Sequence, residues 1–162
     1  ILFLSIQQAR EQILIATPYF VPPTQITQAL RTAALRGIDV RIVLPEKNNH
    51  IYAGMAGRAH YADLLDAGAR ILHRPPPFTH AKAAVFDGPT ALAGSANLDI
   101  RSLQLNYETN LLLSGSDVVD RLKELVLEDL SISREITQPA WDRRPAAAKM
   151  LENFAYLLKP ML

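Results

Sequence analysis

A chain of 162 residues with 49% hydrophobic content can bury the core of one domain and is too short for two ordinary ones. Its 17 Lys and Arg residues nearly balance its 16 Asp and Glu residues, so no broad basic field predicts nucleic-acid binding, and any anion site must be local. The absence of cysteine excludes disulfides and thiolate zinc sites.

The first twenty residues contain neither a basic leader nor a long apolar run, because Ser5 and Gln7 interrupt the opening ILFLSIQQ. This pattern excludes a signal peptide and a membrane-spanning helix in that stretch. The chain also starts without methionine, which favours a fragment of a longer protein. We therefore expect a soluble fragment of a parent protein that can still be membrane-bound.

The first half of the chain alternates strand patterns with helix patterns. Three prolines between residues 18 and 23 predict a loop, Thr24 is a candidate helix cap, and Gly37 is a candidate helix stop. The alternation predicts a largely parallel sheet covered by helices. The predicted elements are strands at 12–17, 38–45 and 69–74, and helices at 25–36 and 51–66.

The second half predicts antiparallel strands and closing helices. An Asp87-Gly88-Pro89 turn joins the two strands of a predicted hairpin, which makes the sheet mixed. The predicted elements are strands at 79–87, 90–95 and 106–113, a capped amphipathic helix at 116–130, and a terminal helix at 146–162. The fold class is therefore α/β, with a mixed sheet flanked by helices.

His80 and Lys82 are the first candidates for chemistry, because alternate residues of a strand point to the same face. A neutral imidazole can attack phosphorus, and a phospho-histidine divides one difficult displacement into two easier ones. Lys82 would neutralise the phosphoryl oxygens. Each residue alone also has an ordinary structural explanation, whereas His50, His60 and His73 have no lysine two positions later.

Four further polar residues complete the candidate site. Ser95 and Asn97 can donate hydrogen bonds to the same oxygens, or can simply cap a turn. Glu108 can accept from His80 and fix its tautomer, although a strand glutamate more often faces solvent. Asp87 suits a hairpin turn whether or not catalysis occurs. No cluster of carboxylates or histidines has metal-ligand spacing, so we expect no metal and no other cofactor.

The combination is more specific than its members. The spacing H-x-K-x4-D, followed by G-S-x-N, resembles the signature of the phospholipase D superfamily. The resemblance implies that His80 is the nucleophile or its acid–base counterpart, that Lys82 and Asn97 contact phosphate beside Ser95, and that Glu108 orients the histidine. It gives Asp87 a supporting role away from the substrate.

Longer phrases resemble bacterial cardiolipin synthases, in particular ATPYFVPP and GSANLDIRSLQLNYE. That resemblance implies transfer of a phosphatidyl group from one phosphatidylglycerol to another, with no nucleic acid bound. The superfamily builds its site from two H-x-K-x4-D motifs, and this chain has one. The second comes either from an N-terminal half of the parent or from a second copy of the chain. A homodimeric nuclease or phosphodiesterase and a non-catalytic binding domain remain alternatives.

We divide the chain into a phospholipase D-like half-domain, residues 1–136, one repeat of the usual two, and a helical extension, residues 137–162. The extension combines basic residues with an apolar stripe, which suits either an anionic membrane surface or the domain's own core. We expect packing on the core. The basic residues are Arg143, Arg144, Lys149 and Lys159, and the stripe is Met150, Leu151, Phe154, Leu157 and Leu158.

Overall fold

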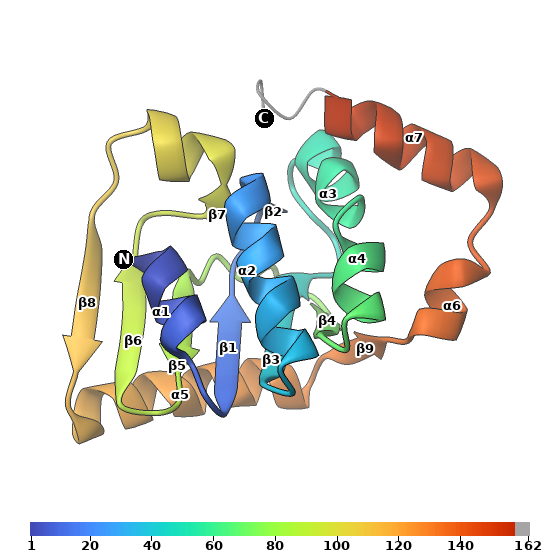
Figure 1. Cartoon of the computed structure of the whole chain (residues 1–162). Coiled ribbons are helices and arrows are strands. Elements are labelled where there is room, and N and C mark those ends of the chain that lie inside the picture. The colour runs from blue at the N-terminus through green and yellow to red at the C-terminus, as the bar shows by residue number, and fades with distance from the viewer. Residues whose placement is uncertain (158–162) are drawn as a thin grey trace.

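The computed structural model describes residues 1–157, which form a seven-stranded mixed sheet (Figure 1). Its strands are β1 Gln12–Ala16, β3 Asp39–Pro45, β4 Arg70–Arg74, β5 Ala83–Phe86, β6 Thr90–Gly94, β8 Asn110–Ser114 and β9 Arg134–Ile136. They lie in the order β8-β6-β5-β1-β3-β4-β9. The β1–β3 and β3–β4 pairs are parallel and the other pairs are antiparallel. The predicted fold class is confirmed.

Helices cover both faces of this sheet. They are α1 Leu2–Gln8, α2 Thr24–Leu35, α3 Ile51–Arg58, α4 Tyr61–Asp66, α5 Ser116–Ser131, α6 Gln138–Asp142 and α7 Ala146–Leu157. Side chains of β1 alternate between two cores: Ile13 and Ile15 pack with residues of α1, α2 and α4, whereas Leu14 packs with residues of α5. Alternate side chains of β1 thus enter two different cores, so the strand is buried on both faces.

Several predicted elements differ in detail. The helix expected over 51–66 is two helices, α3 and α4, because the amides of Ala59 and His60 bond three residues back and tighten the chain there. Pro23, not Thr24, holds the cap position of α2, and Gly115 precedes α5, so neither helix has a side-chain cap hydrogen bond. These capping predictions were wrong.

Short elements without a strong sequence pattern were not predicted. They are α1, α6, β9, the two-stranded parallel sheet of β2 Phe20–Val21 and β7 Leu98–Asp99, and a π-helical turn, η1, at Arg101–Leu105. Thr17 joins β1 to β7, because its hydroxyl accepts from the Leu98 amide and donates to the Tyr19 carbonyl. The pairing of β2 with β7 therefore holds the chain after Ser95 against the end of β1.

The terminal helix does not pack as predicted. Its apolar stripe faces solvent, whereas Glu152 and Ala155 on the other side are buried, so the expectation that the stripe packs on the core was wrong. Leu158 and Lys159 lie outside the described residues. No helix in the part of the chain that the structure describes is both long and apolar enough to cross a bilayer.

A buried pair formed by His73 and Tyr61 makes the stability of this fold depend on pH. His73 Nε2 lies 3.0 Å from the hydroxyl of Tyr61, and both side chains are buried. Burial lowers the pKa of His73 to about 4, with help from the charges of Arg58 and Arg134, and burial raises the pKa of Tyr61. The folded chain therefore takes up a proton on His73 less readily than the unfolded chain does.

We expect stability to fall as the pH drops from about 6.5 towards 4, because the unfolded state binds this proton first. The loss at pH 5, relative to pH 7.5, should be on the order of 2 kcal/mol from His73. Urea unfolding of the wild type and of His73→Gln at both pH values measures it. Equal pH dependence in the two proteins would contradict the assignment.

Candidate active site

His80 and Lys82 lie at the end of the sheet where the parallel strands finish. The strands β1, β3 and β4 run in the same direction, and β5 runs against β1, so the start of β5 lies at the carboxyl end of the parallel strands. His80 and Lys82 precede β5 instead of lying within it, which corrects the predicted strand at 79–87. The Lys82 carbonyl still accepts from the Gly94 amide at 3.3 Å, and the Lys82 ammonium donates to the His80 carbonyl at 3.0 Å.

His80 is exposed and lies between two aromatic rings. Its ring centroid is 5.8 Å from that of Phe78 and 6.1 Å from that of Tyr19. Desolvation, followed by the nearby charge of Lys82, lowers the pKa of His80. Neither ring nitrogen has a hydrogen-bond partner among residues 1–157. The lowered pKa favours the neutral form of His80, in which one ring nitrogen carries a proton and the other offers a lone pair.

Lys82 supplies the positive charge of the site. Partial burial lowers its pKa, while the negative charges of Glu108 and Asp99 act in the opposite direction. Asp99 is buried, accepts a 2.6 Å hydrogen bond from the Ser102 amide and was not predicted as a site residue. Its only signal in the sequence is its position two residues after Asn97, which continues the alternation of Ser95 and Asn97.

Ser95 and Glu108 form a direct pair. The Ser95 hydroxyl donates to a Glu108 carboxylate oxygen and accepts from the Thr109 amide at 3.0 Å. The described residues contain no hydrogen bond between Glu108 and His80, so the predicted orienting role of Glu108 stays a prediction. A Cβ atom at Gly94 would overlap the Thr109 carbonyl, and glycine there lets β6 and β8 approach closely beside Ser95.

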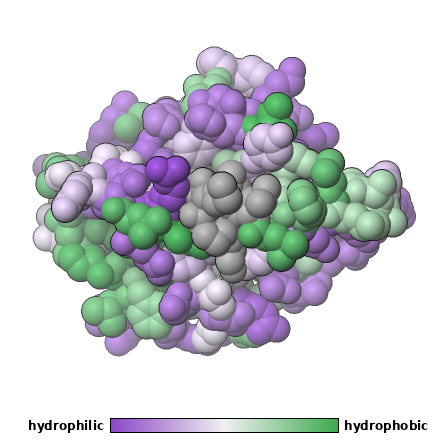
Figure 2. Space-filling view, turned by 90° about the horizontal axis from the view of Figure 1, so that it is seen from above, coloured by the Kyte–Doolittle hydropathy of each residue, from purple (hydrophilic) through white to green (hydrophobic). Residues whose placement is uncertain are grey.

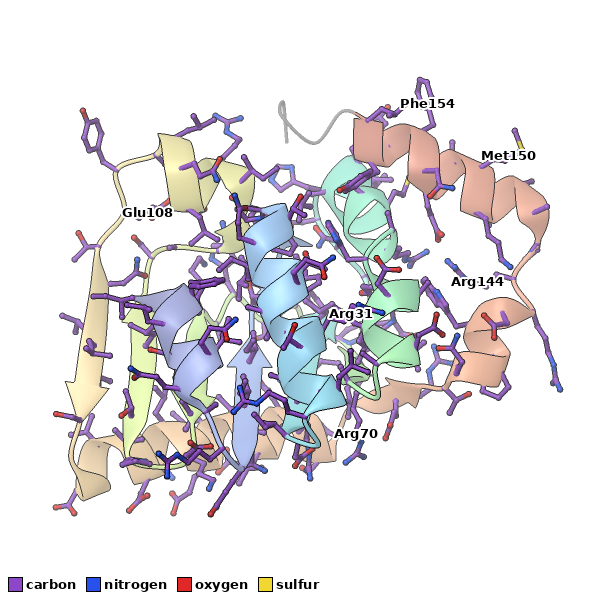
Figure 3. The ribbon with its side chains drawn as sticks, viewed as in Figure 1. Arg31, Arg70, Glu108, Arg144, Met150 and Phe154 are labelled. Carbon is purple, nitrogen blue, oxygen red and sulfur yellow. The ribbon has the colours of Figure 1, made fainter. Side chains whose placement is uncertain are left out.

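Asn97 faces a pocket shared with Lys82 and Glu108. Its amide nitrogen donates to the Ser102 hydroxyl at 3.3 Å. The pocket has a volume of about 590 Å³, and most of its other lining is apolar and comes from α1, the start of α2 and the sheet. Figure 3 shows Glu108 at the upper end of the molecule, below η1. An anionic head group could meet Lys82 here while apolar groups line the rest.

Asp87 lies apart from the other candidates, at the far end of β5. Its carboxylate accepts hydrogen bonds from the amides of Arg10, Glu11 and Gln12 at 2.8–2.9 Å. Burial opposes ionisation, but these amides outweigh it and lower the pKa of Asp87. Asp87 therefore ties the hairpin turn to the start of β1. This contact fixes the register of β5, whose other end carries Lys82. Within residues 1–157, no cluster of three or more potential metal ligands is present.

Comparison with known proteins identifies the family of the chain. Residues 2–130 match the family model described as cardiolipin synthase, PLD-like domain. The chain belongs to this phospholipase D-like family. It is 38% identical over 161 residues to cardiolipin synthase A of Cronobacter sakazakii and 39% identical over 157 residues to the major cardiolipin synthase ClsA of Bacillus subtilis. These matches cover 99% and 97% of this chain but 33% of each relative, so the chain spans about one third of their length.

Solved structures show the same fold. The phospholipase D family member Nuc from Salmonella typhimurium matches with a TM-score of 0.74 at 23% identity, covering 85% of this chain and 89% of Nuc. Phosphatidylserine synthase of Haemophilus influenzae matches with a TM-score of 0.69 at 20% identity, covering 99% of this chain and 43% of that one. The phospholipase D-like chain described here thus has a fold that occurs both as nearly a whole chain and as less than half of one.

Proposed function

We propose that this chain is the C-terminal catalytic half of a phosphatidyltransferase that makes cardiolipin from two phosphatidylglycerol molecules. Two observations carry the proposal: the match to cardiolipin synthases over nearly the whole chain, and the motif of His80 and Lys82 in its sequence. The position of Lys82, Asn97 and Glu108 around one largely apolar pocket supports a lipid phosphodiester as substrate. The parent would act at the bacterial cytoplasmic membrane.

In the first step, a neutral His80 nitrogen attacks phosphorus. The N–P bond forms as the bond from phosphorus to the glycerol oxygen breaks, and a second histidine protonates that oxygen so that glycerol leaves. Lys82 stabilises the charge on the phosphoryl oxygens, helped by Asn97 and Ser95. The lowered pKa of His80 supports this role, because it keeps the attacking nitrogen unprotonated at neutral pH.

In the second step, the hydroxyl of another phosphatidylglycerol attacks the phospho-histidine. The second histidine removes the hydroxyl proton, the new O–P bond forms, and the N–P bond to His80 breaks, which restores the imidazole. This cycle needs two histidines, and the chain has one H-x-K-x4-D motif. We propose that an N-terminal half supplies the other motif and that Glu108 helps to orient a catalytic histidine.

A symmetric pair of chains is the second candidate arrangement, and it would make the protein a homodimeric phosphodiesterase. The match that covers 89% of Nuc favours it, because a single unit of this fold makes up nearly all of that chain. Sedimentation together with an assay on bis(p-nitrophenyl) phosphate separates the two arrangements. An active dimer of the chain alone would overturn the half-site proposal in favour of this candidate.

The direct test is complementation. We expect the chain alone to be inactive, and we expect cardiolipin to form from phosphatidylglycerol vesicles when the chain is combined with the Bacillus subtilis relative shortened by its matching third. Lipid products are measured by mass spectrometry. Formation of free phosphatidic acid in place of cardiolipin would support hydrolysis and contradict the transferase assignment.

A further inference from the structure

The terminal helix α7 turns its apolar side towards solvent. Met150, Phe154 and Leu157 are spaced four and three residues apart, which places them on one side, and they are 73%, 62% and 72% exposed. Leu151 beside them is also exposed. Figure 3 shows Met150 and Phe154 pointing away from the rest of the molecule. Exposure of such an apolar side to water is unfavourable, so covering it with a binding partner would lower the free energy.

Polar contacts on the opposite side hold α7 in this orientation. Glu152 is buried, accepts a hydrogen bond from Arg144 and lies 3.7 Å from the guanidinium of Arg58. The Arg144 guanidinium in turn stacks 3.0 Å above the centre of the Trp141 ring. Rotating the helix to bury its apolar side would break these contacts and leave the Glu152 carboxylate without its partners. The exposure is therefore built into the packing of α7.

The exposed side lies at the end of the molecule that carries the candidate active site. α7 packs against α3, and α3 begins beyond the carboxyl end of β3, the end at which Lys82 also lies. More exposed apolar side chains belong to the start of α3 and to η1 and the chain after it: Ile51, Tyr52, Leu105 and Tyr107. Figure 2 views this end and shows several separate hydrophobic patches across it.

The charges around α7 favour an anionic partner. Within α7, Glu152 is the single acid and is buried and paired, whereas Lys149 is exposed. Just before the helix, Arg143 is exposed and its neighbour Asp142 is an exposed acid. A second copy docked through the same side would bring these cations together. Anionic lipid head groups would instead neutralise them, while Met150 and Phe154 entered the apolar layer below.

We propose that the exposed side of α7 inserts into the interfacial region of an anionic phospholipid bilayer and holds the site-bearing end of the molecule against the membrane. The choice of lipid as partner rests on the proposed function. The binding itself does not need catalysis, so it is measured separately from activity.

The test is binding of the whole chain to vesicles of about one part phosphatidylglycerol to three parts phosphatidylcholine, followed by co-sedimentation. The triple variant Met150→Ser, Phe154→Ser, Leu157→Ser should bind at least about tenfold more weakly than the wild type. The matched control is Val118→Ser, Leu125→Ser, Ile132→Ser, which changes three exposed apolar residues on and just after α5, on the other face of the sheet. It should bind as the wild type does.

Equal binding by the wild type and the α7 variant would overturn the inference, as would a lipid-free dimer that only the α7 variant dissociates. Vesicles with brominated acyl chains give a direct readout: they should quench a tryptophan at Phe154→Trp more strongly than one at Leu125→Trp, and equal quenching would also overturn it. His80→Ala should retain full binding. A chain that binds vesicles but forms no cardiolipin when it is combined with the shortened Bacillus subtilis relative would contradict the proposed function and leave this inference standing.

Discussion

Replacing His80 with alanine should lower phosphatidyl transfer by at least about a thousandfold in the complemented enzyme, because the proposed cycle forms its covalent bond to phosphorus at the His80 ring. The exposed position of His80 predicts that the fold survives. The ring lies beside the rings of Tyr19 and Phe78 and makes no hydrogen bond among residues 1–157. Cardiolipin formation and urea unfolding are measured on the same preparation.

His50 is the matched control. It is also exposed, and its ring packs edge-on against Tyr19 at a centroid distance of 5.4 Å. His80 contacts the same tyrosine ring. His50→Ala should change the rate by less than about threefold, because His50 has no lysine two residues later and no place in the proposed transfer. Loss of activity in both variants to a similar degree would refute the assignment of His80 as nucleophile.

Replacing Asp87 with alanine should destabilise the fold by roughly 2 to 3 kcal/mol. Three backbone amides lose a charged acceptor, and the figure is discounted because the carboxylate is only partly buried. Alanine also tolerates the positive φ of 53° at this position poorly. The free energy of unfolding from urea titration, with activity measured well below the midpoint, separates this loss from a catalytic one.

Asp87→Asn provides the comparison. Asparagine accepts the left-handed backbone and keeps one oxygen acceptor, so it should lose about half as much stability as alanine. Under conditions where both variants are folded, activity should remain within about tenfold of the wild type. If Asp87→Asn were fully stable yet inactive, the carboxylate would act in the chemistry and the anchoring role would be wrong.

Much of the fold could be predicted because short continuous apolar runs are a strong local signal for strands that are buried on both faces. The strands at 12–16 and 39–45 lie between two helical layers, so both of their faces are apolar. Gly37, with a φ of 84°, follows the end of α2 where the sequence predicted a helix stop. The short pairings of β2 and β9 had no comparable signal, because two or three residues gain register only from distant partners.

The candidate site also combines features that the sequence predicted with features that depend on distant contacts. The sequence by itself determined which groups are available for phosphoryl chemistry, since H-x-K-x4-D and G-S-x-N name the side chains through their spacing. Only the tertiary structure decided that Glu108 pairs with Ser95, that Asp99 lies near Lys82, and that Asp87 anchors β1. These contacts join segments that are far apart in the sequence and are brought together by pairing in the sheet. The spacing of residues along the chain does not give the distance between such segments in the fold.

The terminal helix is the clearest case. Periodicity determined that α7 is amphipathic, and from that pattern burial of its apolar side was the natural expectation. The tertiary structure decided which side faces inwards, because Arg58 and Arg144 lie where they can pair with Glu152. A helical pattern specifies two faces, but the groups that each face meets come from the rest of the fold.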